Sequence, residues 1–93
     1  MSNQIETVDI QLIHDQVCDF IRTNFLYSEG DILNDGESLF ERGIVDETGI
    51  LELVMFVEET YGVQVSEADL VPENFDTVNN VVAFVSERLG ADE

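Results

Sequence analysis

Residues 43–62, GIVDETGILELVMFVEETYG, decide how this 93-residue chain folds. Asp46 is a residue type favoured at helix N-caps, and Gly62 can take the left-handed conformation that ends a helix. Between these two signals the apolar residues recur at helical spacing, at Ile50, Leu53, Val54, Val57 and Tyr61. The stretch therefore predicts an amphipathic helix over about residues 46–61 that buries one apolar stripe.

The opposite face of this predicted helix is acidic with an apolar centre. Glu52, Met55, Glu58 and Glu59 fall off the buried stripe, and Leu51 lies at its margin. An exposed face of this kind suits a partner that presents arginine and lysine side chains around an apolar patch. Taken alone, the pattern leaves two interpretations of these five residues open, a solvated face or a partner-docking face.

Two further helices are predicted on either side. The first begins near Thr7 and ends near Asn24, and the last begins after Thr77 and is stopped by Gly90. Their apolar stripes are Ile10, Ile13, Val17, Phe20 and Ile21 in the first, and Val78, Val81, Val82, Val85 and Leu89 in the last.

The connecting segments carry their own anchors. Residues 25–45 form a long loop, in which residues 38–43 are predicted to make a single helical turn. Its expected buried anchors are Leu26, Ile32, Leu33, Leu39, Phe40, Ile44 and Val45. Ser66 and Asp69 form a capping box that opens a short helix, which Pro72 prevents from continuing, and Phe75 is a further core anchor.

These elements predict an all-α fold in one domain, a small four-helix bundle with a long first loop and a short third helix, ordered over about residues 7–90. The chain has 44% apolar residues and a formal net charge of −18, from 21 acidic residues against three arginines. That charge disfavours binding to nucleic acids and anionic membranes. One cysteine and the lack of a long apolar run favour a cytoplasmic protein, and we expect a monomer.

Candidate catalytic and metal-binding residues are few. His14 and Cys18 lie on the first predicted helix without a visible set of partners, so we interpret both as structural residues and predict no metal site. A calcium loop beginning at Asp31 fails because its third and twelfth ligand positions would be Leu33 and Arg42. No nucleophile–base pair, phosphate-binding loop or dinucleotide motif is recognisable, so we do not expect an enzyme.

Several motifs, in this order and at these separations, resemble those of acyl carrier proteins. They are Ser38-Leu39, residues 43–46, residues 51–54 and 58–63, Asp69-Leu70, and residues 73–78. The resemblance covers about residues 8–89. It implies a four-helix bundle that presents thioester-bound acyl or aminoacyl groups on a 4'-phosphopantetheine arm, in fatty acid, polyketide or nonribosomal peptide biosynthesis. The implied partners are a loading ligase, a phosphopantetheinyl transferase, and an acyltransferase or synthase with basic docking surfaces.

The resemblance also places the arm. In the family a serine follows the aspartate that matches Asp46, and its hydroxyl is esterified to phosphopantetheine, but here that position is Glu47. A glutamate has no hydroxyl to form the phosphodiester, so this chain is expected to stay in the apo form. Thr48 has a hindered secondary hydroxyl about 100° further around the helix, and Ser38 matches a separate upstream motif, so neither is expected to substitute.

Three explanations of Glu47 remain open at this point. It could be an engineered replacement whose charge imitates the phosphodiester, a natural loss of carrier chemistry in a noncatalytic acidic docking module, or part of a protein that delivers something by noncovalent binding. A carboxylate in the first helical turn also interacts favourably with the helix dipole, by about 0.3–1 kcal/mol.

Overall fold

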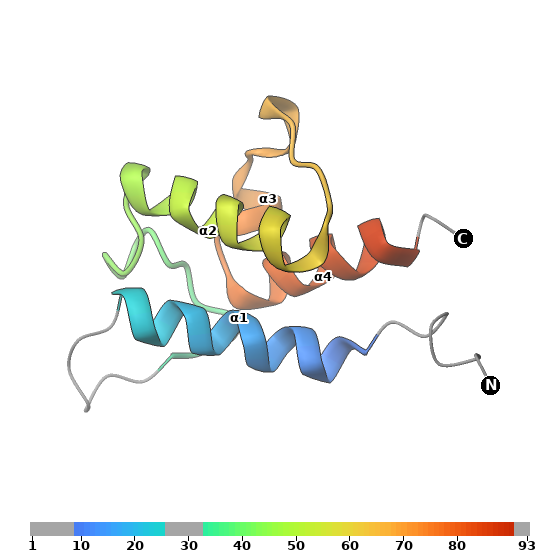
Figure 1. Cartoon of the computed structure of the whole chain (residues 1–93). Helices are drawn as coiled ribbons and strands as arrows, with labels where there is room; N and C mark the ends of the chain where they lie inside the picture. Colours follow the sequence, from blue (N-terminus) through green and yellow to red (C-terminus); the bar gives the residue numbers. More distant parts are fainter. Residues whose placement is uncertain (1–8, 26–32, 91–93) are drawn as a thin grey trace.

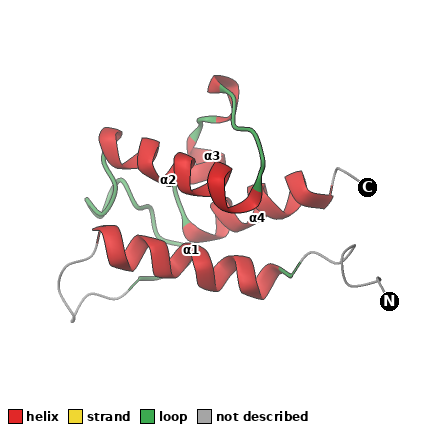
Figure 2. Ribbon diagram, in the orientation of Figure 1, coloured by secondary structure: helices red, strands yellow, loops and turns green. Residues whose placement is uncertain are grey.

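The computed structural model describes residues 9–25 and 33–90, and within these ranges every regular element is a helix (Figure 1, Figure 2). The helices are α1 (Ile10–Phe25), α2 (Glu47–Tyr61), α3 (Pro72–Phe75) and α4 (Val78–Gly90), with a 3-10 helix, η2 (Glu67–Asp69), between α2 and α3. The predicted small helical bundle with a long first loop and a short third helix is confirmed. In the part of the chain that the structure describes, no helix has the length and apolar character needed to cross a membrane.

The helix α1 begins later than the sequence indicated. The side chain of Asp9 accepts a hydrogen bond from the Leu12 N–H at 3.1 Å, so Asp9 is the cap and the helix starts at Ile10. The predicted start near Thr7 is therefore wrong, and Thr7 itself lies outside the described residues. Ile10, which was predicted to belong to the apolar stripe, is 56% exposed, so the buried stripe of α1 begins at Ile13.

The helix α2 matches its prediction at both ends. Asp46 Oδ1 accepts from the Gly49 N–H at 2.8 Å, and Gly62 has φ 71° and closes the helix through a bond from its N–H to the Glu58 carbonyl. The predicted stripe faces inward, with Leu53, Val54 and Val57 buried and Ile50 and Tyr61 half-buried. Phe56, which the stripe omitted, is partly buried and stacks on Phe20 with ring centroids 4.3 Å apart.

The loop before α2 is held by Asp76, the residue that follows α3. The Asp76 side chain accepts from the Ser38 hydroxyl at 2.9 Å, and its carbonyl accepts from the Leu39 N–H at 2.7 Å. The predicted turn forms: the Arg42 N–H donates to the Ser38 carbonyl, and Gly43 has φ 74°.

The loop anchors are only partly as predicted. Leu33, Leu39 and Val45 are buried and Ile44 packs against the core, but Phe40 is 42% exposed. The prediction that Phe40 is a buried anchor is wrong. Phe40 directly follows the buried Leu39 in a tight turn, and neighbouring side chains in such a turn point in different directions. The predicted anchors Leu26 and Ile32 lie outside the described residues.

The segment from Ser66 to Thr77 follows its local signals. The capping box of Ser66 and Asp69 is present and opens η2. Val71 is extended, and Pro72 then takes the first position of α3, where its missing N–H costs nothing. Thr77 Oγ1 accepts from the Asn80 N–H at 2.9 Å, which confirms Thr77 as the cap of α4.

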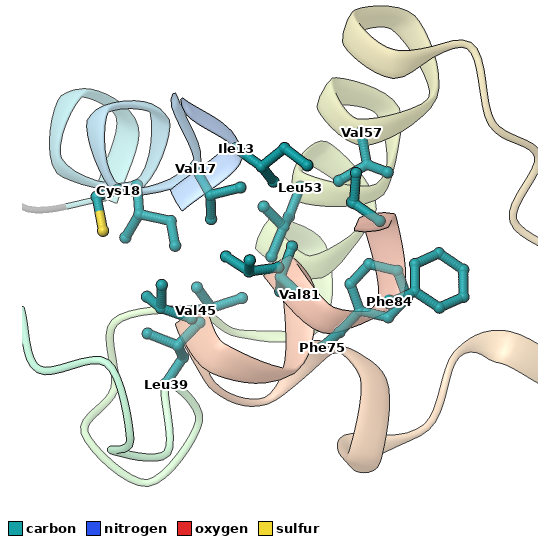
Figure 3. Close-up of a cluster of buried hydrophobic side chains, with 14 of the residues drawn as sticks. Ile13, Val17, Cys18, Leu39, Val45, Leu53, Val57, Phe75, Val81 and Phe84 are labelled. Carbon is teal, nitrogen blue, oxygen red and sulfur yellow. The ribbon is translucent and has the colours of Figure 1, made fainter. Parts of the chain in front are cut away.

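One apolar core joins all four helices and the loop (Figure 3). The helix α4 lies between α1 and α3 and packs against both, while α2 contributes Leu53 and Val57. The sequence stripes omitted Phe84, which is buried beside Phe75 with ring centroids 5.1 Å apart. Each fully buried aliphatic or aromatic side chain contributes about 1.5–3 kcal/mol before chain entropy is subtracted, and these contacts fix the position of α2.

Candidate functional site

The first turn of α2 presents two carboxylates. Asp46 is used internally, because its Oδ1 binds the Gly49 N–H and its carbonyl accepts from the Ile50 N–H at 2.9 Å. Glu47 is the first residue of the helix and its side chain is exposed. The Glu47 carboxylate therefore lies at the positive end of the helix dipole with solvent around it.

Gly49 brings the end of α1 against the start of α2. It is buried, and a Cβ atom built there would lie 2.9 Å from Cε1 of Phe25 and 3.4 Å from Asp46 Oδ1. The close approach requires a glycine. Sequence reasoning missed this residue, although a glycine in the first turn of an otherwise strong helix was the available signal.

A shallow groove of about 320 Å³ opens beside this contact. Its lining includes Phe25 from α1, Gly43 and Ile44 from the loop, and Thr48 and Glu52 from α2. Thr48 is exposed, whereas Ser38 is bound to Asp76 and its Oγ accepts from the Glu41 N–H at 3.1 Å. Ser38 is thus a structural cap of the loop turn.

The outer face of α2 has the predicted apolar centre. Leu51 and Met55 are each 55% exposed, and they continue the line that begins at Glu47 at a spacing of four residues. Glu52 and Glu59 are exposed beside them. We name Leu51, Glu52, Met55 and Glu59 the α2 face.

Glu58 does not share this arrangement. Its side chain is half-buried, and its Oε2 accepts a hydrogen bond from the Val65 N–H at 3.1 Å. The Arg88 guanidinium supports the same segment by donating to the Gln64 carbonyl at 2.9 Å and to Asp69 at 2.7 Å. Glu58 therefore stabilises the chain that leaves α2, a role that its place in the sequence pattern did not indicate.

An apolar pocket of about 190 Å³ lies on another side of α2. Ile50 contributes from α2, and the loop and the α3 region supply the rest of the lining, namely Phe40, Leu70, Val71, Pro72 and Phe75. Three of these residues, Phe40, Leu70 and Val71, are between 37% and 42% exposed. The pocket is apolar and open to solvent.

The structure also brings together three residues that the sequence separates. His14 Nε2 lies 2.8 Å from Asp35 Oδ2, and Cys18 Sγ lies 3.6 Å from the same His14 nitrogen. The hydrogen bond to Asp35 raises the pKa of His14 above its ordinary value, and burial raises the pKa of the Cys18 thiol. The sequence interpretation considered α1 alone, and Asp35 comes from the loop.

Comparison with curated proteins decides the family. The chain is 36% identical over 80 residues to a probable acyl carrier protein, PigG, of a Serratia species, which covers 86% of this chain and 91% of the relative. The chain belongs to the acyl carrier protein family. It is also similar to the D-alanyl carrier proteins of Streptococcus uberis (28% identical, covering 85% of this chain and 98% of the relative) and Streptococcus sanguinis (27%, covering 82% and 94%). No family model matches the chain.

Membership of the acyl carrier protein family indicates that the start of α2 is the part of the chain to compare with the attachment site of other carrier proteins. Carrier proteins of this family use a phosphopantetheine arm, and the position that the motif match assigns to its attachment is Glu47. The residue present there does not fit covalent attachment, because a carboxylate lacks the hydroxyl oxygen that the phosphodiester requires. The carrier fold is thus present, with a glutamate at the position that the motif match assigns to attachment.

Proposed function

We propose that this protein docks on the enzymes of a carrier-dependent biosynthetic pathway through the α2 face, and that Glu47 keeps it in the unmodified form. The exposure of Leu51 and Met55 between the acidic residues Glu52 and Glu59 is the observation that carries this proposal. Neither apolar side chain packs against the bundle, so both are available to a partner.

Charge and apolar contact have separate roles in this docking. Acidic side chains steer a basic partner surface toward the helix and set the orientation of the encounter. Leu51 and Met55 then supply apolar area that is removed from water, and methionine adapts to partners of different shape. The partners that fit are a phosphopantetheinyl transferase, a loading ligase, and an acyltransferase or synthase.

The loading position is otherwise arranged for a modified side chain. Residue 47 is exposed at the first position of α2, and the Asp46 cap holds the backbone there through its bond to Gly49. A serine at this exposed position would present its hydroxyl to solvent. We therefore infer that the scaffold is a competent carrier in which one residue blocks acylation chemistry.

The direct test is intact mass after incubation with coenzyme A and a permissive phosphopantetheinyl transferase. The unaltered chain and Glu47→Ser are compared, with Glu47→Gln as a control that removes the charge and adds no hydroxyl. We expect the phosphopantetheine mass on Glu47→Ser only. A gain by the unaltered chain would overturn the apo assignment and indicate Thr48, whereas no gain by Glu47→Ser would refute the competent scaffold.

The same background tests the α2 face. In Glu47→Ser, reversing Glu52 and Glu59 to lysine should lower the kcat/KM of the transferase about tenfold at low ionic strength, and less at high salt. The matched control is the double reversal Glu73→Lys and Glu87→Lys, which makes the same change of net charge at exposed positions on α3 and α4. Glu58 is left unchanged because it holds Val65. Equal kcat/KM values for the α2 variants and the control would contradict the assignment.

A docking module without carrier chemistry is the second candidate, and the exposed carboxylate of Glu47 favours it. It predicts that Glu47→Ser gains no phosphopantetheine, whereas the unaltered chain still competes with a modifiable carrier protein for the same enzyme. The competition assay uses such a carrier protein as the substrate and the unaltered chain as the inhibitor. Cytoplasmic location and a monomeric state stay predictions from the sequence.

A further inference from the structure

We propose that His14, Cys18 and Asp35 form a zinc site that joins α1 to the first loop, with His14 Nε2, Cys18 Sγ and Asp35 Oδ2 as ligands and water in the fourth position. All three atoms lie within 4.8 Å of one another. They are a nitrogen, a sulfur and a carboxylate oxygen, which is a donor set that Zn²⁺ binds in tetrahedral geometry.

The distance between Cys18 and His14 fits a tetrahedral ion, and the Asp35 carboxylate has to shift to complete the site. With Zn–S of about 2.3 Å and Zn–N of about 2.05 Å, the sulfur and nitrogen of a tetrahedral site are separated by about 3.6 Å. The separation between Cys18 Sγ and His14 Nε2 is 3.6 Å. Nitrogen and oxygen ligands are separated by about 3.4 Å in such a site, so Asp35 Oδ2, now 2.8 Å from His14 Nε2, has to withdraw by about half an ångström.

The carboxylate of Asp35 is not placed as in a catalytic triad of cysteine, histidine and aspartate. In a triad the nucleophile and the carboxylate bind opposite nitrogens of the imidazole, as Cys18 and Asp15 do here. Asp35 instead approaches Nε2, the nitrogen that Cys18 also contacts. Convergence on a single ring nitrogen indicates a common centre that the three atoms can share.

The other nitrogen of His14 has the partner that a metal-bound histidine needs. Its Nδ1 lies 3.4 Å from Asp15 Oδ1. A carboxylate on the second nitrogen holds the N–H there, leaves Nε2 unprotonated for the ion and orients the ring. Asp15 is thus a positioning residue for the proposed site.

The backbone positions the ligands before an ion arrives. His14 and Cys18 are four residues apart on α1, so their side chains lie on one helix face. The Asp35 carbonyl accepts from the Asn79 N–H at 3.0 Å, which ties this part of the loop to α4. In Figure 3 the sulfur of Cys18 lies at the edge of the apolar cluster, away from its centre.

An ion can reach this site from solvent. The side chains of His14 and Asp35 are 29% and 45% exposed, although Cys18 is buried. The net charge of −18 attracts cations to the whole surface. Binding releases the Cys18 thiol proton to solvent, together with the imidazole proton of any His14 that is charged, so affinity rises with pH.

Cobalt(II) is the probe that reports both stoichiometry and ligand type. The reduced, full-length protein is titrated with Co²⁺ in the presence of excess Mg²⁺, which occupies weak carboxylate sites. We expect one equivalent to produce a thiolate-to-cobalt charge-transfer band and the intense visible bands of a tetrahedral ion. Zn²⁺ should then abolish both, because it binds a site of this kind more tightly.

Three variants and one control test the ligands. Cys18→Ser should remove the charge-transfer band, and His14→Gln and Asp35→Asn should each weaken Co²⁺ binding about tenfold or more. The control is Asp19→Asn, an exposed carboxylate on the same helix, which should bind Co²⁺ as the unaltered chain does. Circular dichroism is used to check that each variant is folded, and Asp35→Asn keeps the test valid if Cys18→Ser destabilises the core.

Two outcomes would refute the site. One is a weak, octahedral cobalt spectrum without charge transfer, which would show only general attraction to an acidic surface. The other is a cobalt affinity that does not change in His14→Gln or Asp35→Asn. The readouts do not involve phosphopantetheine or a partner enzyme, so they stand independently of the proposed function.

Discussion

The difference between Glu58 and Glu59 offers a sharp test of the structure. The two residues are adjacent on α2, carry the same charge and were given the same docking role by the sequence pattern. In the structure Glu58 accepts a hydrogen bond from the Val65 N–H at 3.1 Å, whereas Glu59 is exposed. We predict that Glu58→Ala destabilises the fold and that Glu59→Ala weakens docking instead.

The expected loss follows from the hydrogen bond. A bond to a charged acceptor contributes about 1.5–3 kcal/mol, and since Glu58 and Val65 are only half-buried, the lower end, about 1.5 kcal/mol, applies. For a domain of this size, that loss corresponds to a Tm lower by about 6–12 °C. Glu59→Ala should change the free energy of unfolding by less than about 0.5 kcal/mol.

The pair is its own control. Both substitutions remove one negative charge from a chain of net charge −18 and gain the same helix propensity, so these contributions cancel in the comparison. Urea denaturation followed by circular dichroism gives both free energies of unfolding. Equal values for the two variants would show that the Glu58–Val65 bond does not stabilise the protein, and would return Glu58 to the docking face.

Four further outcomes are expected. Asp46→Ala should cost about 1 kcal/mol in urea denaturation and Asp46→Asn much less, because asparagine also caps the helix; equal losses would argue against the cap. Gly62→Ala should lower the free energy of unfolding by about 1 kcal/mol because φ is 71° there. Gly90 has no positive φ and no close neighbour, so Gly90→Ala should leave the free energy of unfolding unchanged. A loss of stability in Gly90→Ala alone would contradict this. Hydrogen bonds from Ser66 and the charge of Arg88 lower the pKa of Asp69 below 3.8. The ionised carboxylate therefore stabilises the fold above that pH, and this contribution is lost as the pH falls through the pKa of the folded state. An NMR titration should show that the Asp69 pKa rises in Arg88→Gln. Salt should raise the Tm by screening repulsion among the acidic residues, and a Tm independent of ionic strength would refute that.

Both boundaries of α2 and the start of α4 could be predicted from the sequence because their signals are local. Asp46 binds an N–H three residues away, and Gly62 adopts a conformation that other residues avoid, so each acts within its own turn. Thr77 and the capping box of Ser66 and Asp69 work in the same way. The family motifs then placed Glu47 at the loading position, which periodicity alone does not reveal.

The start of α1 shows how a local signal can mislead. Thr7 and Asp9 are both capping residue types, and the choice between them depends on where the helix finds its first buried contact at Ile13. Phe40 shows that a local signal can also mislead about burial, since an apolar residue next to the buried Leu39 in a turn need not face the core. In both cases packing overrides the preference of the single residue.

The sequence by itself determined the helical class, the caps of α2, the acidic face with Leu51 and Met55, and the presence of a glutamate where the motif match assigns attachment. Only the tertiary structure decided that the Glu58 carboxylate accepts a hydrogen bond from Val65 and that Phe25 packs closely against Gly49. It also brought Asp35 into contact with His14, which lies beside Cys18. The reason is physical. Caps and stripes act over four residues or fewer along one helix, whereas these contacts depend on the path of the loops and on how the helices pack, which no short window of sequence contains.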